Sequence, residues 1–136
     1  MVELEHLVGA MGYAPSVVST ENTAITMGSG ALPVLATPAL VALVEHAAAS
    51  AVTSYLPPGM TTVGTNIHLR HLAATPIGHN VQAEAVLVSV SGRRLEFKVT
   101  AYDEREKIAE GVHERFIVDA ERFMAKMADK KPKGLP

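Results

Sequence analysis

The chain has 136 residues, with 12 Lys and Arg against 14 Asp and Glu, a formal net charge of −2 and no cysteine. This length is typical of one domain, which we expect to span residues 1–136. The lack of cysteine excludes a disulfide scaffold, a cysteine nucleophile and a thiolate metal site. An aromatic content of 4% and a near-neutral charge argue against nucleic acid as a partner, because nucleic-acid binders need a basic face with stacking rings.

The charges are distributed unevenly along the chain. Residues 22–69 contain one charged side chain, the carboxylate of Glu45, where an ordinary soluble composition would place roughly ten. We expect no membrane span in this region, because Pro38, Glu45 and His46 interrupt its most apolar part. The start of the chain is acidic where a secretory signal would be basic, so we expect a cytoplasmic protein.

One strong helical segment follows a possible strand. Residues 17–27 could form the strand, and residues 38–55 carry apolar side chains at helical spacing around most of the helix surface. Such a pattern is typical of a buried helix. Thr37 is a plausible N-cap with Pro38 at the first helical position, and the Leu-Pro-Pro-Gly run at 56–59 ends the helix.

Four segments of strand length come next, separated by turn signals, and a short helix closes the chain. The strands are expected at about 61–75, 79–90, 93–102 and 108–119, and the closing helix at about 120–129. The connections are too short for crossover helices, so we expect consecutive strands to pair antiparallel as a meander. The second strand changes the phase of its apolar alternation, which predicts a bulge or burial on both faces.

This order of elements predicts an α+β hotdog fold. An antiparallel sheet of about five strands would wrap around one long buried helix. Because such a sheet covers only part of an apolar helix, we expect a homodimer or a higher homo-oligomer.

Glu45 is the first candidate for chemistry. A lone carboxylate on an apolar helix is either paired or functional, so Glu45 could act as a general base or as a nucleophile. The alternative is a glutamate on the one exposed stripe of the helix.

His71 and Thr37 are the other two candidates. If residues 62–73 form a regular strand, His71 shares its apolar face with Val63 and Thr65 and points toward the helix. A buried histidine is often only a core residue, but a histidine facing a glutamate can activate water or a hydroxyl. Thr37 could simply cap the helix, although a hydroxyl beside free backbone N–H groups could also take part in binding an oxyanion.

Five stretches closely resemble the fluoroacetyl-CoA thioesterase-like family of hotdog proteins. They are ATPALVALVE at 36–45, TVGT at 62–65 followed by His71, ATPIG at 74–78, GRR at 92–94 and GVHER at 111–115. The resemblance covers about residues 17–130 and keeps the order and spacing of the motifs. It implies hydrolysis of an acyl-CoA thioester.

The resemblance also implies roles for particular residues. The family's threonine, glutamate and histidine fall on Thr37, Glu45 and His71. Gly64 would let the backbone approach the thioester carbonyl, and Arg115 resembles a contact to the site or to coenzyme A. The fluoroacetyl-specific branch has aromatic residues before the helix, whereas GSGALP at 28–33 has none. We therefore expect a less tightly lidded acyl pocket and a short or medium acyl-CoA as the substrate.

Two other functions fit the same pattern. Hotdog hydratases and dehydratases also pair a histidine with a helix carboxylate, and a related domain could bind acyl-CoA without turnover. The chain contains neither the His-Glu-x-x-His zinc pattern nor a Gly-x-Ser-x-Gly elbow. We expect no metal and no cofactor, since coenzyme A would be part of the substrate.

Overall fold

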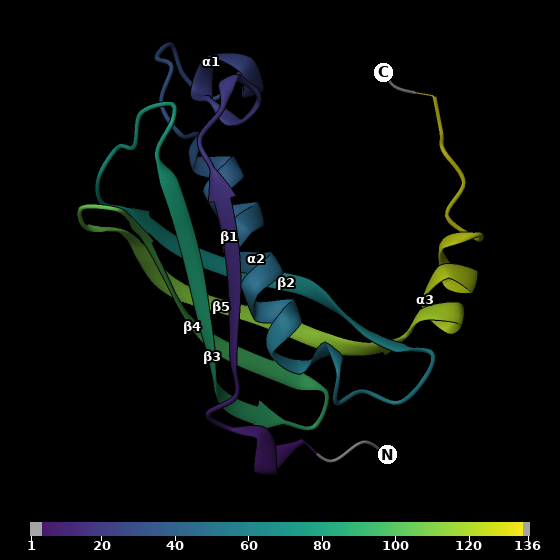
Figure 1. Ribbon diagram of the computed structural model, residues 1–136. Helices are drawn as coiled ribbons and strands as arrows, with labels where there is room; N and C mark the ends of the chain where they lie inside the picture. The colour runs from purple at the N-terminus through teal and green to yellow at the C-terminus, as the bar shows by residue number, and fades with distance from the viewer. Residues whose placement is uncertain (1–3, 135–136) are drawn as a thin grey trace.

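The apolar helix and the strands that follow it form the two layers of the fold. In the computed structural model, which describes residues 4–134, a five-stranded antiparallel sheet curves around helix α2, Thr37–Thr53 (Figure 1). The strands are β1 (Met11–Val17), β2 (Met60–His71), β3 (Asn80–Ser91), β4 (Arg94–Asp103) and β5 (Lys107–Asp119). The shorter elements are η1 (Glu5–Leu7), η2 (Thr20–Asn22), α1 (Ala24–Met27) and α3 (Ala120–Met127). None of these helices is long and apolar enough to cross a membrane.

The strand order in the sheet is β1-β3-β4-β5-β2, with every neighbouring pair antiparallel. Strands β3, β4 and β5 form the expected meander. The expected pairing of β2 with β3 is wrong, because β2 lies at the far edge beside β5 and β1 pairs with β3 instead. The connection at 72–79 is held by other segments: Leu72 N donates to Ile108 O, and Gly78 N donates to Val18 O. Eight residues are enough to span the roughly 14 Å between these strands.

The expected strand at 17–27 is also wrong. The first strand ends at Val17, and the following residues form η2 and α1. The side chain of Thr23 caps α1 by accepting from Thr26 N, and Gly28 ends it with a φ of 73°. Capping residues at both ends therefore outweigh the β-branched composition of this segment.

One face of α2 lies in the core. Its buried residues are Leu40, Val44, Ala47, Ala48, Ala51 and Val52. They pack with the inner residues of the sheet, including Phe97 of β4, which is fully buried. Ala42 and His46 remain exposed on the other side of the helix. The composition of the helix had suggested burial all round. Within one chain, however, part of its surface is exposed.

Two β-bulges set which residues face the helix. The bulge in β3, between Leu87 and Ser89, confirms one of the two explanations for the phase change in that strand. A second bulge in β2, between Gly64 and Asn66, was not expected. Because residues that pair across two strands share a face, Gly64 lies on the same side as its partner Arg115.

The bulge corrects the predicted register of β2. His71 does face the helix side, since its partner Ala109 is fully buried. Thr65 does not share that face: its hydroxyl donates to the Glu114 carboxylate at 2.7 Å, and Glu114 pairs with Asn66 beyond the bulge. The extra residue therefore switches the strand from one alternation to the other.

Gly12 of β1 supplies a test of the packing between the layers. A Cβ at this position would overlap Ala47 O of α2 and leave no room for the helix. We predict that Gly12→Ala lowers the free energy of unfolding by about 1–3 kcal/mol, measured by urea denaturation. Gly134→Ala is the control, because a Cβ there meets open space. Equal urea midpoints for the two variants would contradict the close packing of β1 on α2.

Candidate active site

Thr37 and His71 meet where the start of α2 passes the end of β2. The structure corrects the predicted cap by one residue: the N-cap is Ala36, and Thr37 is the first residue of the helix. No side chain caps this end of α2. The Thr37 Oγ1 lies 2.8 Å from His71 Nδ1 instead, and Thr37 is exposed. Its hydroxyl is therefore free of a capping role and available to the histidine.

The environment of His71 favours a neutral ring. Burial lowers its pKa, and a weaker backbone interaction at Ala73 opposes the effect. Its Nε2 atom is buried and has no hydrogen-bond partner among residues 4–134. A buried polar atom without a partner is costly, and such atoms are often found where a protein binds or reacts.

Glu45 lies on α2 two turns after Thr37 and belongs to a second cluster. Its Oε2 accepts a hydrogen bond from Arg115 Nη1 at 3.2 Å and lies 3.8 Å from His113 Nε2. The side chain is 39% exposed, and the carboxylate is ion-paired at the edge of the core. Gly64 of β2 makes this position possible, because a Cβ there would overlap Oε2.

Arg115 is the centre of the second cluster. Its Nε donates to Thr62 Oγ1 at 2.9 Å and its Nη2 to Thr62 O at 3.1 Å. Its Nη1 lies 3.2 Å from both Glu45 Oε2 and His113 Nε2. These contacts use four of the five N–H groups of a guanidinium. Burial lowers the pKa of Arg115, and the nearby Glu45 carboxylate opposes that effect.

His113 is the residue of this cluster that the sequence analysis missed. It precedes Arg115 by two positions on β5, so the two side chains share the inner face of the strand. His113 is 3% exposed. The signal was present in the GVHER motif. Its histidine and arginine are two residues apart on the strand, and Ile117, two residues further on, is buried.

The candidate residues therefore form two groups in one chain. Thr37 is paired with His71, and Glu45 is held with Gly64 and Arg115. Thr37 and Glu45 are eight residues apart, which is about 12 Å along a helix axis. Within residues 4–134, no hydrogen bond or ion pair joins Glu45 to either Thr37 or His71. Over the same range, no three His, Asp or Glu side chains are grouped to hold a metal ion.

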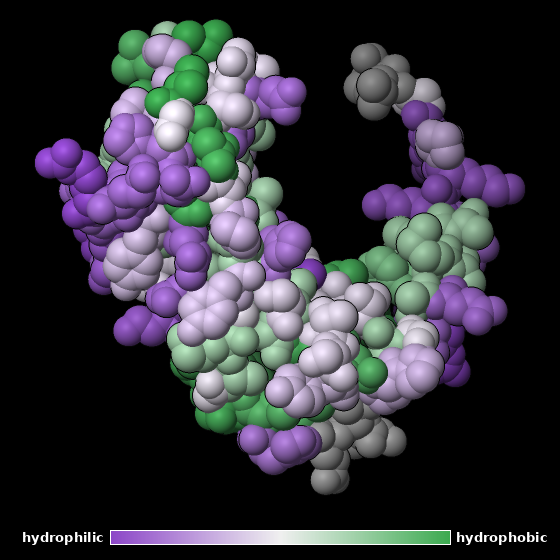
Figure 2. All heavy atoms as spheres, viewed as in Figure 1, coloured by the Kyte–Doolittle hydropathy of each residue, from purple (hydrophilic) through white to green (hydrophobic). Residues whose placement is uncertain are grey.

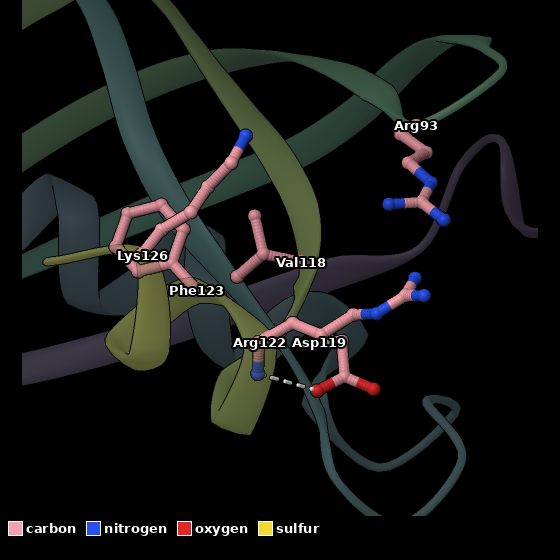
Figure 3. A pocket seen from close by; sticks show the side chains of 6 residues that line it. All are labelled: Arg93, Val118, Asp119, Arg122, Phe123 and Lys126. Atoms are coloured by element: carbon pink, nitrogen blue, oxygen red, sulfur yellow. Dashed lines mark hydrogen bonds between the residues drawn. The ribbon is translucent and has the colours of Figure 1, made fainter. Parts of the chain in front are cut away.

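A separate hollow of about 500 Å³ lies at the base of α3 (Figure 3). It is lined by Arg93, Val118, Asp119, Arg122, Phe123 and Lys126, none of which is a predicted site residue. The dashed line in Figure 3 is the N-terminal cap of α3, in which Arg122 N donates to Asp119 Oδ1 at 3.0 Å. This hollow follows from the way α3 leaves β5.

Comparisons with known proteins show the family of the chain. Residues 18–121 match the family described as fluoroacetyl-CoA-specific thioesterase. The chain is 45% identical, over 101 residues, to a fluoroacetyl-CoA thioesterase of Streptantibioticus cattleyicolor; the match covers 74% of this chain and 73% of that protein.

Solved structures support the same conclusion. The fluoroacetyl-CoA thioesterase FlK is 37% identical, with a TM-score of 0.87, and the match covers 92% of this chain and 97% of that one. A hot-dog-like protein from Thermanaerovibrio acidaminovorans is 24% identical, with a TM-score of 0.87 over 98% of this chain and 100% of that one, and shows the fold alone. The chain therefore belongs to the fluoroacetyl-CoA-specific thioesterase family of hotdog enzymes.

Proposed function

We propose that this protein hydrolyses the thioester of a short or medium acyl-CoA, giving the free acid and coenzyme A. The observation that carries the proposal is the 2.8 Å contact between the exposed Thr37 hydroxyl and His71 Nδ1. A neutral histidine beside a hydroxyl can accept its proton. The reaction as proposed uses water and no cofactor. We place it in the cytoplasm, where coenzyme A esters are formed and consumed.

The proposed roles follow from the two groups of residues. Glu45 acts as the general base or as a transient nucleophile at the thioester carbon, His71 moves the proton, and Thr37 polarises the substrate or attacks it. The net reaction adds water across the bond between the acyl carbon and sulfur. The thiolate is a good leaving group, so little acid catalysis is needed. Backbone N–H groups at the start of α2 or near Gly64 would stabilise the oxyanion.

We propose that a homodimer completes the site. Strand β2 lies at an edge of the sheet, and Ala42 and His46 of α2 are exposed. If a second copy pairs antiparallel with β2 about an axis through His68, His71 of the partner subunit lies opposite Gly64, since both are three pairing positions from the axis once the extra residue of the bulge is skipped. The Thr37 group of one chain would then approach the Glu45 group of the other.

The segment before α2 supports a broad acyl specificity. Three large apolar side chains there are exposed: Ile25, Met27 and Leu32. Figure 2 shows hydrophobic residues at the top of the molecule, over the α1 end. The residues at 28–31 are small, and none of those at 28–33 is aromatic. We propose that this segment closes loosely over the acyl group, so that fluoroacetyl-CoA is one of several substrates.

The first prediction about activity concerns Glu45 and His71. Glu45→Gln and His71→Ala should each lower the rate of thiol release by about 100-fold or more, as expected for a lost acid or base. A thiol-reactive dye would follow release from acetyl-, fluoroacetyl-, phenylacetyl- and longer acyl-CoAs. His6→Ala is the control, because His6 is exposed and lies outside β2 and α2.

Full thiol release by both Glu45→Gln and His71→Ala would reject the roles proposed for these residues. Two other results would reject the thioesterase assignment. One is an absorbance change from an enoyl-CoA without free thiol, which would identify a hydratase. The other is binding of acyl-CoA with no product by mass spectrometry, which would identify a binding module.

The second prediction tests the shared site. We expect the inactive Glu45→Gln and His71→Ala chains, unfolded and refolded together in equal amounts, to recover about a quarter of wild-type activity. Half of the dimers would be mixed, and each mixed dimer would contain one intact site. Each variant refolded alone is the control. No recovered activity, with mixed dimers present by mass spectrometry, would show that each site lies within one chain.

The third prediction concerns Gly64. An added Cβ would displace the Glu45 carboxylate and would also lie 3.2 Å from Arg115 Nη1 and 3.3 Å from His113 Cε1. Gly64 is not among the glycines with positive φ, so crowding rather than backbone strain would cause the effect. We expect Gly64→Ala to lower kcat/KM by about tenfold or more. Unchanged kcat/KM, relative to Gly134→Ala, would contradict the role of this glycine.

A further inference from the structure

His113 of β5 lies beside both β2 and the ion pair between Arg115 and Glu45. Its Nδ1 lies 2.7 Å from Asn66 O, next to the β2 bulge. Its Nε2 lies 3.2 Å from Arg115 Nη1 and 3.8 Å from Glu45 Oε2. The side chain is 1% exposed, so both ring nitrogens are bound by protein groups rather than by bulk solvent.

The hydrogen-bond partners of the His113 ring determine which of its nitrogens carries a hydrogen. The Asn66 carbonyl can only accept, so Nδ1 carries a hydrogen and donates it. The Arg115 guanidinium can only donate, so Nε2 is unprotonated and accepts. His113 is therefore a neutral imidazole in the Nδ1–H tautomer.

The surroundings of His113 agree with a neutral ring. Burial is the main cause that lowers its pKa, and the charge of Arg115 lowers it further. The Asn66 carbonyl, Glu45 and Glu114 raise it, but they do not reverse the shift. Phe97 of β4 packs against the ring, with 6.3 Å between the ring centroids, and adds no charge.

We propose that His113 is a positioning residue for the hydrolysis proposed above, on which this inference rests. Its unprotonated Nε2 holds one Nη1 hydrogen of Arg115, while the other Nη1 hydrogen binds Glu45. The guanidinium is thereby fixed on three sides, and the carboxylate takes one orientation. His113 does not touch the substrate. It acts through Arg115 on Glu45.

Protonation of His113 would reverse this arrangement. Nε2 would become a donor facing another donor of the same charge on Arg115, 3.2 Å away. The Glu45 Oε2, 3.8 Å from the same nitrogen, would be drawn toward the imidazolium. Glu45 would then leave the orientation set by Arg115, and activity would fall at pH values below the usual histidine range.

NMR tests the tautomer without any activity measurement. Long-range proton–nitrogen correlation spectra of the 15N-labelled protein at pH 7 should show His113 with Nδ1 protonated and Nε2 unprotonated. His113→Gln assigns the signals by removing them. An Nε2–H tautomer or an imidazolium at pH 7 would overturn the proposal.

Kinetics test the positioning role. His113→Gln keeps an acceptor for Arg115 and should stay within a few-fold of wild type at pH 7. His113→Phe keeps the shape without the acceptor and should lower kcat/KM by about 10- to 100-fold. In a plot of log kcat/KM against pH, the slope on the acid side should be smaller by one in His113→Gln than in wild type, because the variant lacks one protonation that lowers activity. The control His6→Gln should leave the slope unchanged, because His6 is exposed and lies outside β2 and α2.

The outcomes separate this inference from the proposed function. Equal acid slopes in wild type and His113→Gln would overturn the positioning role, and so would wild-type kcat/KM in His113→Phe. If His113→Phe does not fold, the Gln variant and the spectra still decide. A wild-type protein that hydrolyses no acyl-CoA would reject the proposed function itself, whatever tautomer His113 shows.

Discussion

The ion pair between Arg115 and Glu45 joins the helix to the sheet. A guanidinium that is 10% exposed cannot stay charged without partners, so the carboxylate of α2 has to meet it. Thr62 binds the rest of the guanidinium and anchors it to β2. The pair joins β5, β2 and α2 at the same rotation of the helix that buries Leu40 and Val44. This rotation also brings Thr37, two turns before Glu45, to His71.

Two histidines are kept neutral by the same cause and serve different ends. Burial is the largest influence on the pKa of both His71 and His113. His113 has a protein partner on each ring nitrogen and so acts as a rigid brace. His71 has Thr37 on one nitrogen and no described partner on the other. A ring with a free buried nitrogen is suited to moving a proton.

Sequence patterns predicted the helix, four of the strands and the candidate residues Thr37, Glu45 and His71. Those signals are local, since they depend on helical spacing, on strand alternation and on the scarcity of charged residues between positions 22 and 69. The pairing of β2 with β5 was not predictable, because eight connecting residues permit either neighbour. His113 was missed for a related reason: its importance comes from Asn66 and Glu45, which only the folded sheet brings beside it.

The bulge in β2 makes the count of residues in this strand part of the chemistry. Between Gly64 and His71 the chain has one residue more than a regular strand would need to keep both on the inner face. Removing Thr65 would therefore give a regular strand with Gly64 and His71 still on that face. Removing one residue between 66 and 70 while the bulge remains would instead turn His71 away from Thr37. The position of the bulge, and not the motifs alone, therefore decides whether a homologue with the same motifs keeps the pair.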